Sequence, residues 1–263
     1  MSNTQVISVF IIMLLRYLLI AGAAFLIFYI LYPKRFYVKK IQKQFPKNKD
    51  YFREIIYSLF TVIIFAGITF ILYSPLIKPH TKIYTKISDH GILYFVLSVF
   101  LALIIHDTYF YWTHRLMHHP TLFKLFHLTH HRSVNPSPWA AYAFNPLEAI
   151  VEAGVIFVIT FIIPINSIAL LIFLLVMIIY NVYGHLGYEI YPHRVVKSKL
   201  GKWLNTSTNH NMHHKYFNGN YGLYFRYWDE IMKTTHPDYE DTLNQITAKS
   251  ITSATKKREV HPV

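Results

Sequence analysis

The feature that most constrains this chain is a set of long apolar runs separated by short polar segments. The first run covers residues 6–31 and carries a single charge, Arg16. A helix needs about 20 mainly apolar residues to cross the hydrocarbon core of a bilayer. This run and the similar runs at 55–73 and 92–113 therefore predict three membrane helices.

Two shorter apolar runs, 147–163 and 168–184, follow later in the chain. Pro164, Asn166 and Ser167 between them indicate a tight turn, so the pair predicts a hairpin that dips through the membrane. Charged residues make up 15% of the chain, whereas soluble domains carry about 25%. We predict an all-α, integral-membrane helical bundle of four to five membrane helices, with a cytosolic helical cap.

Basic residues predict the orientation of these helices. The segment 33–53 carries eight lysines and arginines, and the loop 76–89 carries three. Cytoplasmic loops are enriched in such residues, so we place 33–53 in the cytoplasm. Counting spans onward then places 114–146 and everything after Gly184 on the same side. Lysines that touch anionic headgroups also account for the net charge of +13, so we expect a membrane partner and no nucleic acid.

Histidine is the unusual residue, with 16 copies against 13 acidic residues and no cysteine. Three groups have helical spacing, one HxxxH and two HxxHH. Residues three and four apart share a helix face, and neutral imidazole is the commonest metal ligand. Each group therefore predicts ligands presented together, and the orientation brings all three to the cytoplasmic side. The groups are His114 and His118; His127, His130 and His131; and His210, His213 and His214.

The absence of cysteine excludes thiolate zinc sites and iron–sulfur clusters. No HExxH string of a zinc protease occurs, and a transporter would place its ligands near the bilayer midplane. Two nitrogen-ligated irons at the membrane surface suit O2 activation on a lipid that enters from the bilayer. Zinc remains a possible occupant of purified material, because it binds imidazole more tightly than ferrous iron does.

Four strings resemble the fatty acid hydroxylase / sterol desaturase superfamily. They are DTYFYWTHRLMHH (107–119), HLTHHRSVNPSPWAAYAFNPLEA (127–149), GHLGYE (184–189) and HNMHHKYFNGNYGLYFRYWDEIMKT (210–234). The resemblance covers 91–236 and implies a membrane di-iron enzyme that uses O2 and external electrons to hydroxylate or desaturate lipids. It divides the chain into N-terminal membrane helices with a basic loop (1–90), a catalytic domain (91–240) and a polar tail (241–263), frayed from Gln245.

The resemblance also implies which residues bind the metal. The eight clustered histidines match its ligand positions, and His185 matches the single histidine after the hairpin. Close relatives often read AFHPLEA where this chain has Asn145, and many have a second histidine where it has Asn209. Asn145 is therefore a possible site residue, through a water or a hydrogen bond to a ligand.

Three further residues have two interpretations each, and a fourth, His119, has a weaker signal. His106 lies two turns before His114 and is either a deeper ligand or, as we favour, a buried polar helper. Asp107 either orients a ligand imidazole or pairs with Arg115. Glu189 is either a ligand or a partner of His185. His119 has weaker spacing than the clustered histidines.

These features predict an O2-dependent lipid hydroxylase or desaturase with two iron ions, acting on a sterol or fatty acyl chain. We expect a separate electron donor, a ferredoxin or a small cytochrome with its reductase. The compact size resembles bacterial members, so we expect a bacterial cytoplasmic membrane. Two alternatives stay open: a membrane metal-binding or metal-transport protein without redox catalysis, and a non-redox zinc hydrolase.

Overall fold

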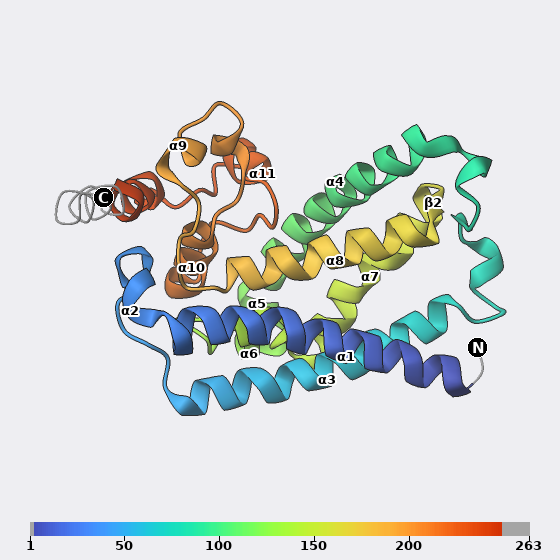
Figure 1. The fold of residues 1–263 in the computed structure, drawn as a ribbon, viewed down its shortest axis with the longest axis horizontal. Helices are drawn as coiled ribbons and strands as arrows, with labels where there is room; N and C mark the ends of the chain where they lie inside the picture. The colour runs from blue at the N-terminus through green and yellow to red at the C-terminus, as the bar shows by residue number, and fades with distance from the viewer. Residues whose placement is uncertain (1–2, 249–263) are drawn as a thin grey trace, which may run out of the picture.

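A computed structural model describes residues 3–248. Five long helices run side by side along the long axis of the molecule (Figure 1). They are α1 (Asn3–Phe25), which continues as a π-helix (Leu26–Leu31), α3 (Asn48–Leu72), α4 (Gly91–Met117), α7 (Pro146–Ile162) and α8 (Ser167–Gly184).

Shorter elements connect these helices and cap one end of the bundle. The short α-helices are α2 (Pro33–Phe36), α5 (Pro120–Phe126), α6 (Leu128–His131), α9 (His193–Val196), α10 (Ser207–Tyr216) and α11 (Tyr227–Ile231). The 3₁₀ helices are Tyr37–Lys39, Lys78–His80, Ile87–Asp89, Pro138–Tyr142 and Gly201–Trp203. The two-residue strands are β1 (Ile83–Tyr84) and β2 (Ile165–Asn166).

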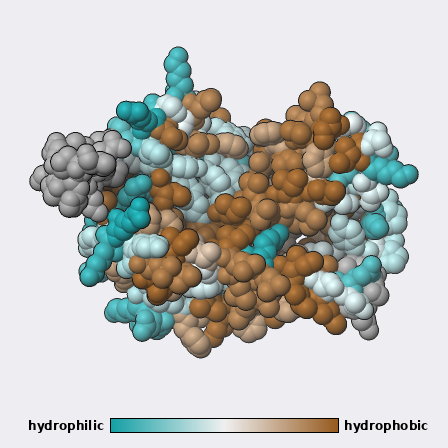
Figure 2. All heavy atoms as spheres, viewed as in Figure 1, coloured by the Kyte–Doolittle hydropathy of each residue, from teal (hydrophilic) through white to brown (hydrophobic). Residues whose placement is uncertain are grey.

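The predicted all-α membrane bundle is confirmed. Four helices are long and apolar enough to cross a membrane: Thr4–Leu31, Asn48–Leu72, Gly91–Met117 and Ser167–Gly184. α7 has 17 residues and is followed by α8 after a short turn, as expected, and residues of both helices belong to one buried cluster with Leu72 and Ala102. Figure 2 shows hydrophobic residues covering the middle of the molecule. The membrane helices carry exposed large apolar side chains such as Leu19, 67% exposed, and Leu93, 82% exposed.

The turn of the hairpin contains a contact that the sequence did not predict. β2 pairs in parallel with β1, with Ile83 opposite Ile165 and Tyr84 opposite Asn166. The Asn166 side chain accepts a hydrogen bond from the backbone N–H of Ile168 at 2.9 Å and so caps α8. This end of the bundle is therefore tied to the loop that precedes α4.

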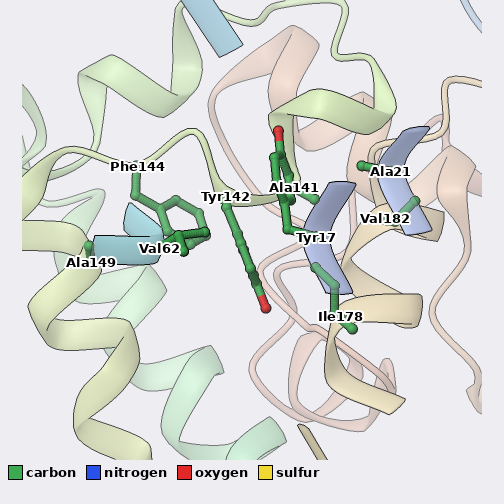
Figure 3. Close-up of a cluster of buried hydrophobic side chains, with 9 residues drawn as sticks. All are labelled: Tyr17, Ala21, Val62, Ala141, Tyr142, Phe144, Ala149, Ile178 and Val182. Carbon is green, nitrogen blue, oxygen red and sulfur yellow. The ribbon is translucent and has the colours of Figure 1, made fainter. Parts of the chain in front are cut away.

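A buried cluster joins the N-terminal helices to the rest of the bundle (Figure 3). Tyr17 and Tyr142 stack with ring centroids 5.5 Å apart, and Val62, Phe144 and Ile178 belong to the same cluster. Burying side chains of this size contributes about 1.5–3 kcal/mol each. Residues from α1, α3, α7, α8 and the 138–142 helix therefore share one core.

The segments predicted to be cytoplasmic contact one another. Gln42 Nε2 donates to the Val134 carbonyl at 2.8 Å and to Asn211 Oδ1 at 3.0 Å. Arg53 Nη2 donates to the Arg132 carbonyl at 3.1 Å. The basic segment, the loop after α6 and α10 are thus held at one end of the bundle, opposite the hairpin turn (Figure 1).

The polar tail is more ordered at its start than the composition suggested. Residues 239–248 are helical, and Ile246 and Thr247 are buried. Leu243 packs in a cluster with Val196 and Met212. The remainder of the predicted tail, 249–263, lies outside the described residues.

Candidate metal centre

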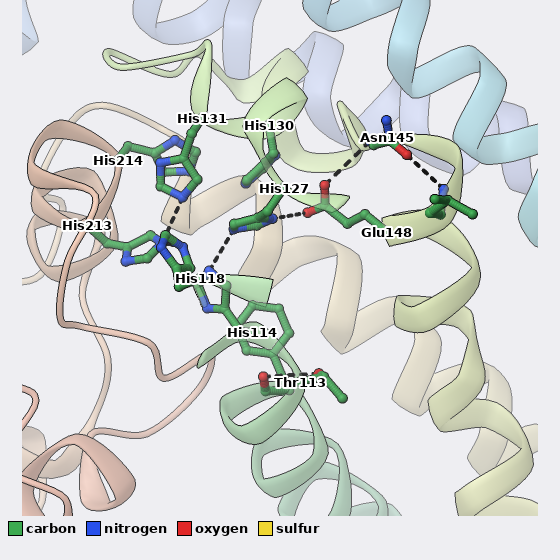
Figure 4. A network of polar contacts seen from close by, with 12 residues as sticks. Thr113, His114, His118, His127, His130, His131, Asn145, Glu148, His213 and His214 are labelled. Atoms are coloured by element: carbon green, nitrogen blue, oxygen red, sulfur yellow. Dashed lines mark hydrogen bonds and ion pairs between the residues drawn. The ribbon is translucent and has the colours of Figure 1, made fainter. Parts of the chain in front are cut away.

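Nine histidines converge in two groups at the capped end of the bundle. The first group contains five: His114, His118, His127, His131 and His213. Its Nε2 atoms approach closely, with 2.9 Å between His114 and His127 and 3.0 Å between His131 and His213 (Figure 4). His118 Nε2 lies 3.1 Å from His213 Nε2.

The second group contains four histidines: His130, His185, His210 and His214. His185 is central, because its Nε2 lies 3.1, 3.0 and 3.2 Å from the Nε2 atoms of His130, His210 and His214. All four side chains are buried. The two groups are neighbours, since the rings of His131 and His214 stack with centroids 4.8 Å apart.

Each HxxHH motif is divided between the two groups. His127 and His131, four residues apart, serve the first group, and His130 serves the second. In α10 the outer pair, His210 and His214, serves the second group and His213 the first. The expectation that each motif presents its histidines together is thus true of the residues four apart, while the middle histidine turns to the other group.

The geometry of both groups fits metal ions. A metal with imidazole ligands at about 2.0–2.1 Å places neighbouring nitrogens roughly 3.0–3.4 Å apart, and the Nε2 separations of 2.9–3.2 Å agree. Nδ1 of His114 faces the Tyr221 carbonyl at 3.0 Å, and Nδ1 of His127 faces Glu148 Oε1 at 2.6 Å. Because each Nδ1 therefore carries the proton, two bare lone pairs meet at 2.9 Å, an arrangement that a cation between them stabilises.

Acceptors behind the rings orient four of the histidines. Besides His114 and His127, His213 Nδ1 donates to the Gly219 carbonyl and His185 Nδ1 to the Asn181 carbonyl, both at 2.7 Å. Such bonds fix the tautomer that leaves Nε2 free for a metal, and they raise ligand basicity.

The turn after α10 supplies two of these carbonyls. Phe217, Gly219 and Asn220 have positive φ angles of 64°, 74° and 56°, which lets the chain fold back over the histidines. Asp229 holds the turn, because its carboxylate accepts hydrogen bonds from the backbone N–H groups of Tyr221 and Gly222, both at 2.9 Å. The turn thus links α11 to His114 and His213.

Burial keeps the imidazoles neutral. It lowers the pKa of His185 to about 4, against the opposing effect of its hydrogen bond to Asn181. It lowers the pKa of His118 to about 2, with a further contribution from the nearby His114. The pKa values of His130, His131 and His214 are also lowered well below the usual range by burial. A neutral imidazole is the form that binds a metal.

The three other candidate site residues lie around the centre, outside both histidine groups. Asp107 Oδ1 accepts from the backbone N–H groups of Tyr224, at 2.6 Å, and Phe225, at 3.1 Å. Asn145 caps α7 through a 2.9 Å bond from the Leu147 N–H. These bonds give both residues a positioning role.

Glu189 joins the segment after His185 to α10. Its carboxylate accepts from the Tyr183 hydroxyl at 2.9 Å, and from the backbone N–H and the hydroxyl of Thr208 at 3.1 and 2.8 Å. Burial raises its pKa, and these hydrogen bonds partly offset the increase.

Two histidines with open interpretations lie apart from the groups. His106 Nδ1 pairs with the Tyr224 hydroxyl at 2.9 Å, in the buried polar role that we favoured. His119 is exposed and its Nδ1 pairs with the Thr121 hydroxyl at 2.8 Å.

Sequence reasoning underestimated the groups behind the ligands. Glu148 is not among the site residues that the sequence predicts, yet its Oε1 lies 2.6 Å from Nδ1 of His127. Its place in the α7 capping box with Asn145 is a signal that could have located it. The acceptors at Asn181, Gly219 and Tyr221 are backbone carbonyls, which every residue carries, so no residue type in the sequence indicates their role.

Comparison with known proteins agrees with this architecture. The model of the fatty acid hydroxylase family matches residues 99–234, just over half of the chain. The chain belongs to the fatty acid hydroxylase / sterol desaturase superfamily. The matched region includes all nine converging histidines and begins within α4.

The relatives of this chain include enzymes whose names refer to sterols. A Delta(7)-sterol 5(6)-desaturase of Gibberella zeae is 33% identical over 178 residues, which cover 67% of this chain and 53% of that protein. Human lathosterol oxidase is 29% identical over 190 residues, 72% of this chain and 62% of that protein. The chain thus aligns with about half to three fifths of the length of these relatives. No solved structure shows a significant match.

The family and the four apolar helices identify an integral membrane protein. These named relatives come from a fungus and a mammal. The bacterial cytoplasmic membrane therefore stays a prediction.

Proposed function

We propose that this protein is a membrane-bound, di-iron lipid oxygenase that hydroxylates or desaturates a lipid with O2 and external electrons. The observation that carries the proposal is the pair of adjacent histidine groups, five and four, with converging Nε2 atoms. Two irons held there would supply the activation of O2 that oxidation of an unactivated C–H bond requires. The sterol enzymes among the relatives favour a sterol as substrate.

The protein's own residues prepare the site for this chemistry. The hydrogen bonds to Nδ1 of His114, His127, His185 and His213 hold the rings in place before the metals bind, so little reorganisation is needed. Burial of the rings excludes bulk water, which strengthens electrostatic interactions within the site. On the bundle side, the apolar ring of Phe144 packs against His130, with ring centroids 5.1 Å apart.

Electrons would come from a separate carrier, a ferredoxin or small cytochrome with its reductase. Exposed basic residues of the 33–53 segment, such as Lys34 and Arg35, lie at the capped end that holds the histidines. Complementary charge guides the docking of an acidic partner. We place this end in the cytoplasm, as the positive-inside rule predicts.

The proposal is tested by lipid analysis of a host with and without the protein. We expect one lipid class to gain one oxygen or to lose two hydrogens, and His130→Ala to abolish the change. His119→Ala is the matched control, since this exposed histidine belongs to neither group. Unchanged lipids with iron loaded and a competent reductase present would contradict the proposal. Altered metal flux with unchanged lipids would instead identify a metal-transport protein, and hydrolysis without O2 or reductant a zinc hydrolase.

A further inference from the structure

A groove on the membrane face of the bundle leads to a recess with two ionisable side chains. The groove lies between α1, α3, α7 and α8, has a volume of about 640 Å³, and is lined by apolar residues together with polar ones, Lys78 among them. A smaller recess of about 50 Å³ adjoins it and shares Met13, Arg16 and Leu174 with it. Figure 2 shows a hollow with a hydrophilic side chain in the hydrophobic surface between α1 and α8. Binding sites for small molecules commonly measure about 300–1,000 Å³.

Arg16 and Glu152 both line the recess. Arg16 lies near the middle of the span Thr4–Leu31, where a charged side chain is costly and usually functional. Its Nε is buried without a hydrogen-bond partner, and its Nη2 makes one long bond, 3.4 Å, to the Tyr142 hydroxyl. Glu152 is 9% exposed. Within residues 3–248 the Glu152 carboxylate receives no hydrogen bond and forms no ion pair with Arg16.

This pair specifies the chemistry of a ligand. Arg16 offers a hydrogen-bond donor and Glu152 an acceptor, so together they match a hydroxyl group, which needs one of each. A carboxylate or phosphate offers only acceptors and would leave Glu152 without a donor, and a phospholipid headgroup is too large for a recess of about 50 Å³. The remaining surface takes an apolar body.

The recess lies close to the metal centre. Tyr142, which bonds to Arg16, is 6.2 Å from Phe144 between ring centroids, and Phe144 is 5.1 Å from His130. On the other side, Glu152 is one helical turn along α7 from Glu148, the partner of His127. A molecule anchored in the recess therefore has its polar end nearest the histidines.

We propose that the groove binds a neutral lipid alcohol by its hydroxyl. Arg16 donates a hydrogen bond to the hydroxyl oxygen, and Glu152 accepts a hydrogen bond from the hydroxyl O–H. The apolar body, sterol or alkyl chain, fills the groove between α1 and α8. This inference rests on the proposed lipid oxidation and names its substrate class. Arg16 and α3 precede the family match, which begins at residue 99, so helices outside the family region contribute to the selection of the substrate.

The test is photolabelling of the purified full-length protein in nanodiscs with a diazirine analogue of cholesterol that keeps its hydroxyl. Competitors are cholesterol, cholesteryl methyl ether, oleyl alcohol and oleic acid. We expect label on α1, α7 or α8 and competition by the alcohols. The ether and the acid should compete about tenfold less well, because each leaves a buried polar group unpaired. If cholesterol competes better than oleyl alcohol, the hydroxyl belongs to a sterol; if oleyl alcohol competes better, it belongs to a straight-chain alcohol.

Arg16→Met and Glu152→Gln should each weaken labelling about tenfold or more. The matched control Arg194→Met, at an exposed arginine on α9, should leave it unchanged. Equal competition by cholesterol and its methyl ether would overturn the proposal even if Arg16→Met failed to fold, because that comparison uses the unmodified protein. Unchanged labelling of folded Arg16→Met and Glu152→Gln variants would contradict the proposal. Arg16 and Glu152 would then be a structural pair bridged by water.

The two proposals can fail separately. Hydroxyl-dependent labelling without any lipid oxidation would retain the groove and contradict the oxygenase. Oxidation that is insensitive to Arg16→Met and Glu152→Gln would retain the oxygenase and contradict the groove.

Discussion

The contact between Glu148 and His127 makes the strongest test of the metal centre. Glu148 Oε1 lies 2.6 Å from His127 Nδ1, and the two side chains are 1% and 3% exposed. Glu148→Gln keeps the size and an acceptor oxygen but removes the negative charge. A hydrogen bond to a charged group contributes about 1.5–3 kcal/mol and a neutral one about 0.5–1.5 kcal/mol. The loss of about 1–2 kcal/mol predicts metal binding roughly 5–30-fold weaker in the five-histidine group.

The assay is metal retention under a graded chelator challenge, measured by mass spectrometry of the metal content. We expect Glu148→Gln to lose metal at a lower chelator concentration than the parent protein. Glu240→Gln, at a side chain that is 53% exposed and outside both histidine groups, is the control and should retain both metals. Parent-like retention of both metals in a folded Glu148→Gln variant would refute the assignment of Glu148 as the residue that orients His127.

Three further predictions concern the surroundings of the centre. In metal-free protein the unfolding temperature should fall as the pH drops below about 6.5. Unfolded histidines then take up protons that buried ones such as His185, with a pKa of about 4, exclude. A flat profile below pH about 6.5 would contradict burial of neutral imidazoles. Asp229→Asn replaces an acceptor of two backbone N–H bonds and should lower the unfolding temperature by about 2–6 °C. The shift is measured by calorimetry, with Asp238→Asn at an exposed position as the control. If Asp229→Asn shifts the unfolding temperature no more than Asp238→Asn does, the turn does not depend on Asp229. Gly187→Ala should also destabilise the fold, since φ is +73° and the new Cβ would lie 2.7 Å from the Tyr29 hydroxyl oxygen; an unchanged denaturation midpoint would exclude this clash.

The sequence predicted those parts of the fold that depend on periodicity. Apolar runs located the membrane helices, because a bilayer fixes the length of a span. Lysines and arginines then predicted that the 33–53 segment and the histidine-bearing segments share one end, and the contacts of Gln42 with Val134 and Asn211 agree.

The sequence did not predict features that arise from tertiary contact. The division of each HxxHH motif depends on where α6 and α10 face each other, which helical spacing alone does not determine. The pairing of β1 with β2 joins residues about 80 positions apart through backbone groups that any sequence carries. Asp107 was expected beside an imidazole or Arg115, but its acceptor oxygen is used by the backbone of Tyr224 and Phe225.

The division of the motifs makes the two histidine groups mechanically inseparable. His213 and His214 are adjacent on α10 and serve different groups, as do His130 and His131 on α6. A rotation of either helix that improves the geometry of one group must therefore alter the other. Seating the first metal fixes both helices and thereby prepares the second site, so loading is expected to be cooperative and a protein with a single metal should be a minor species.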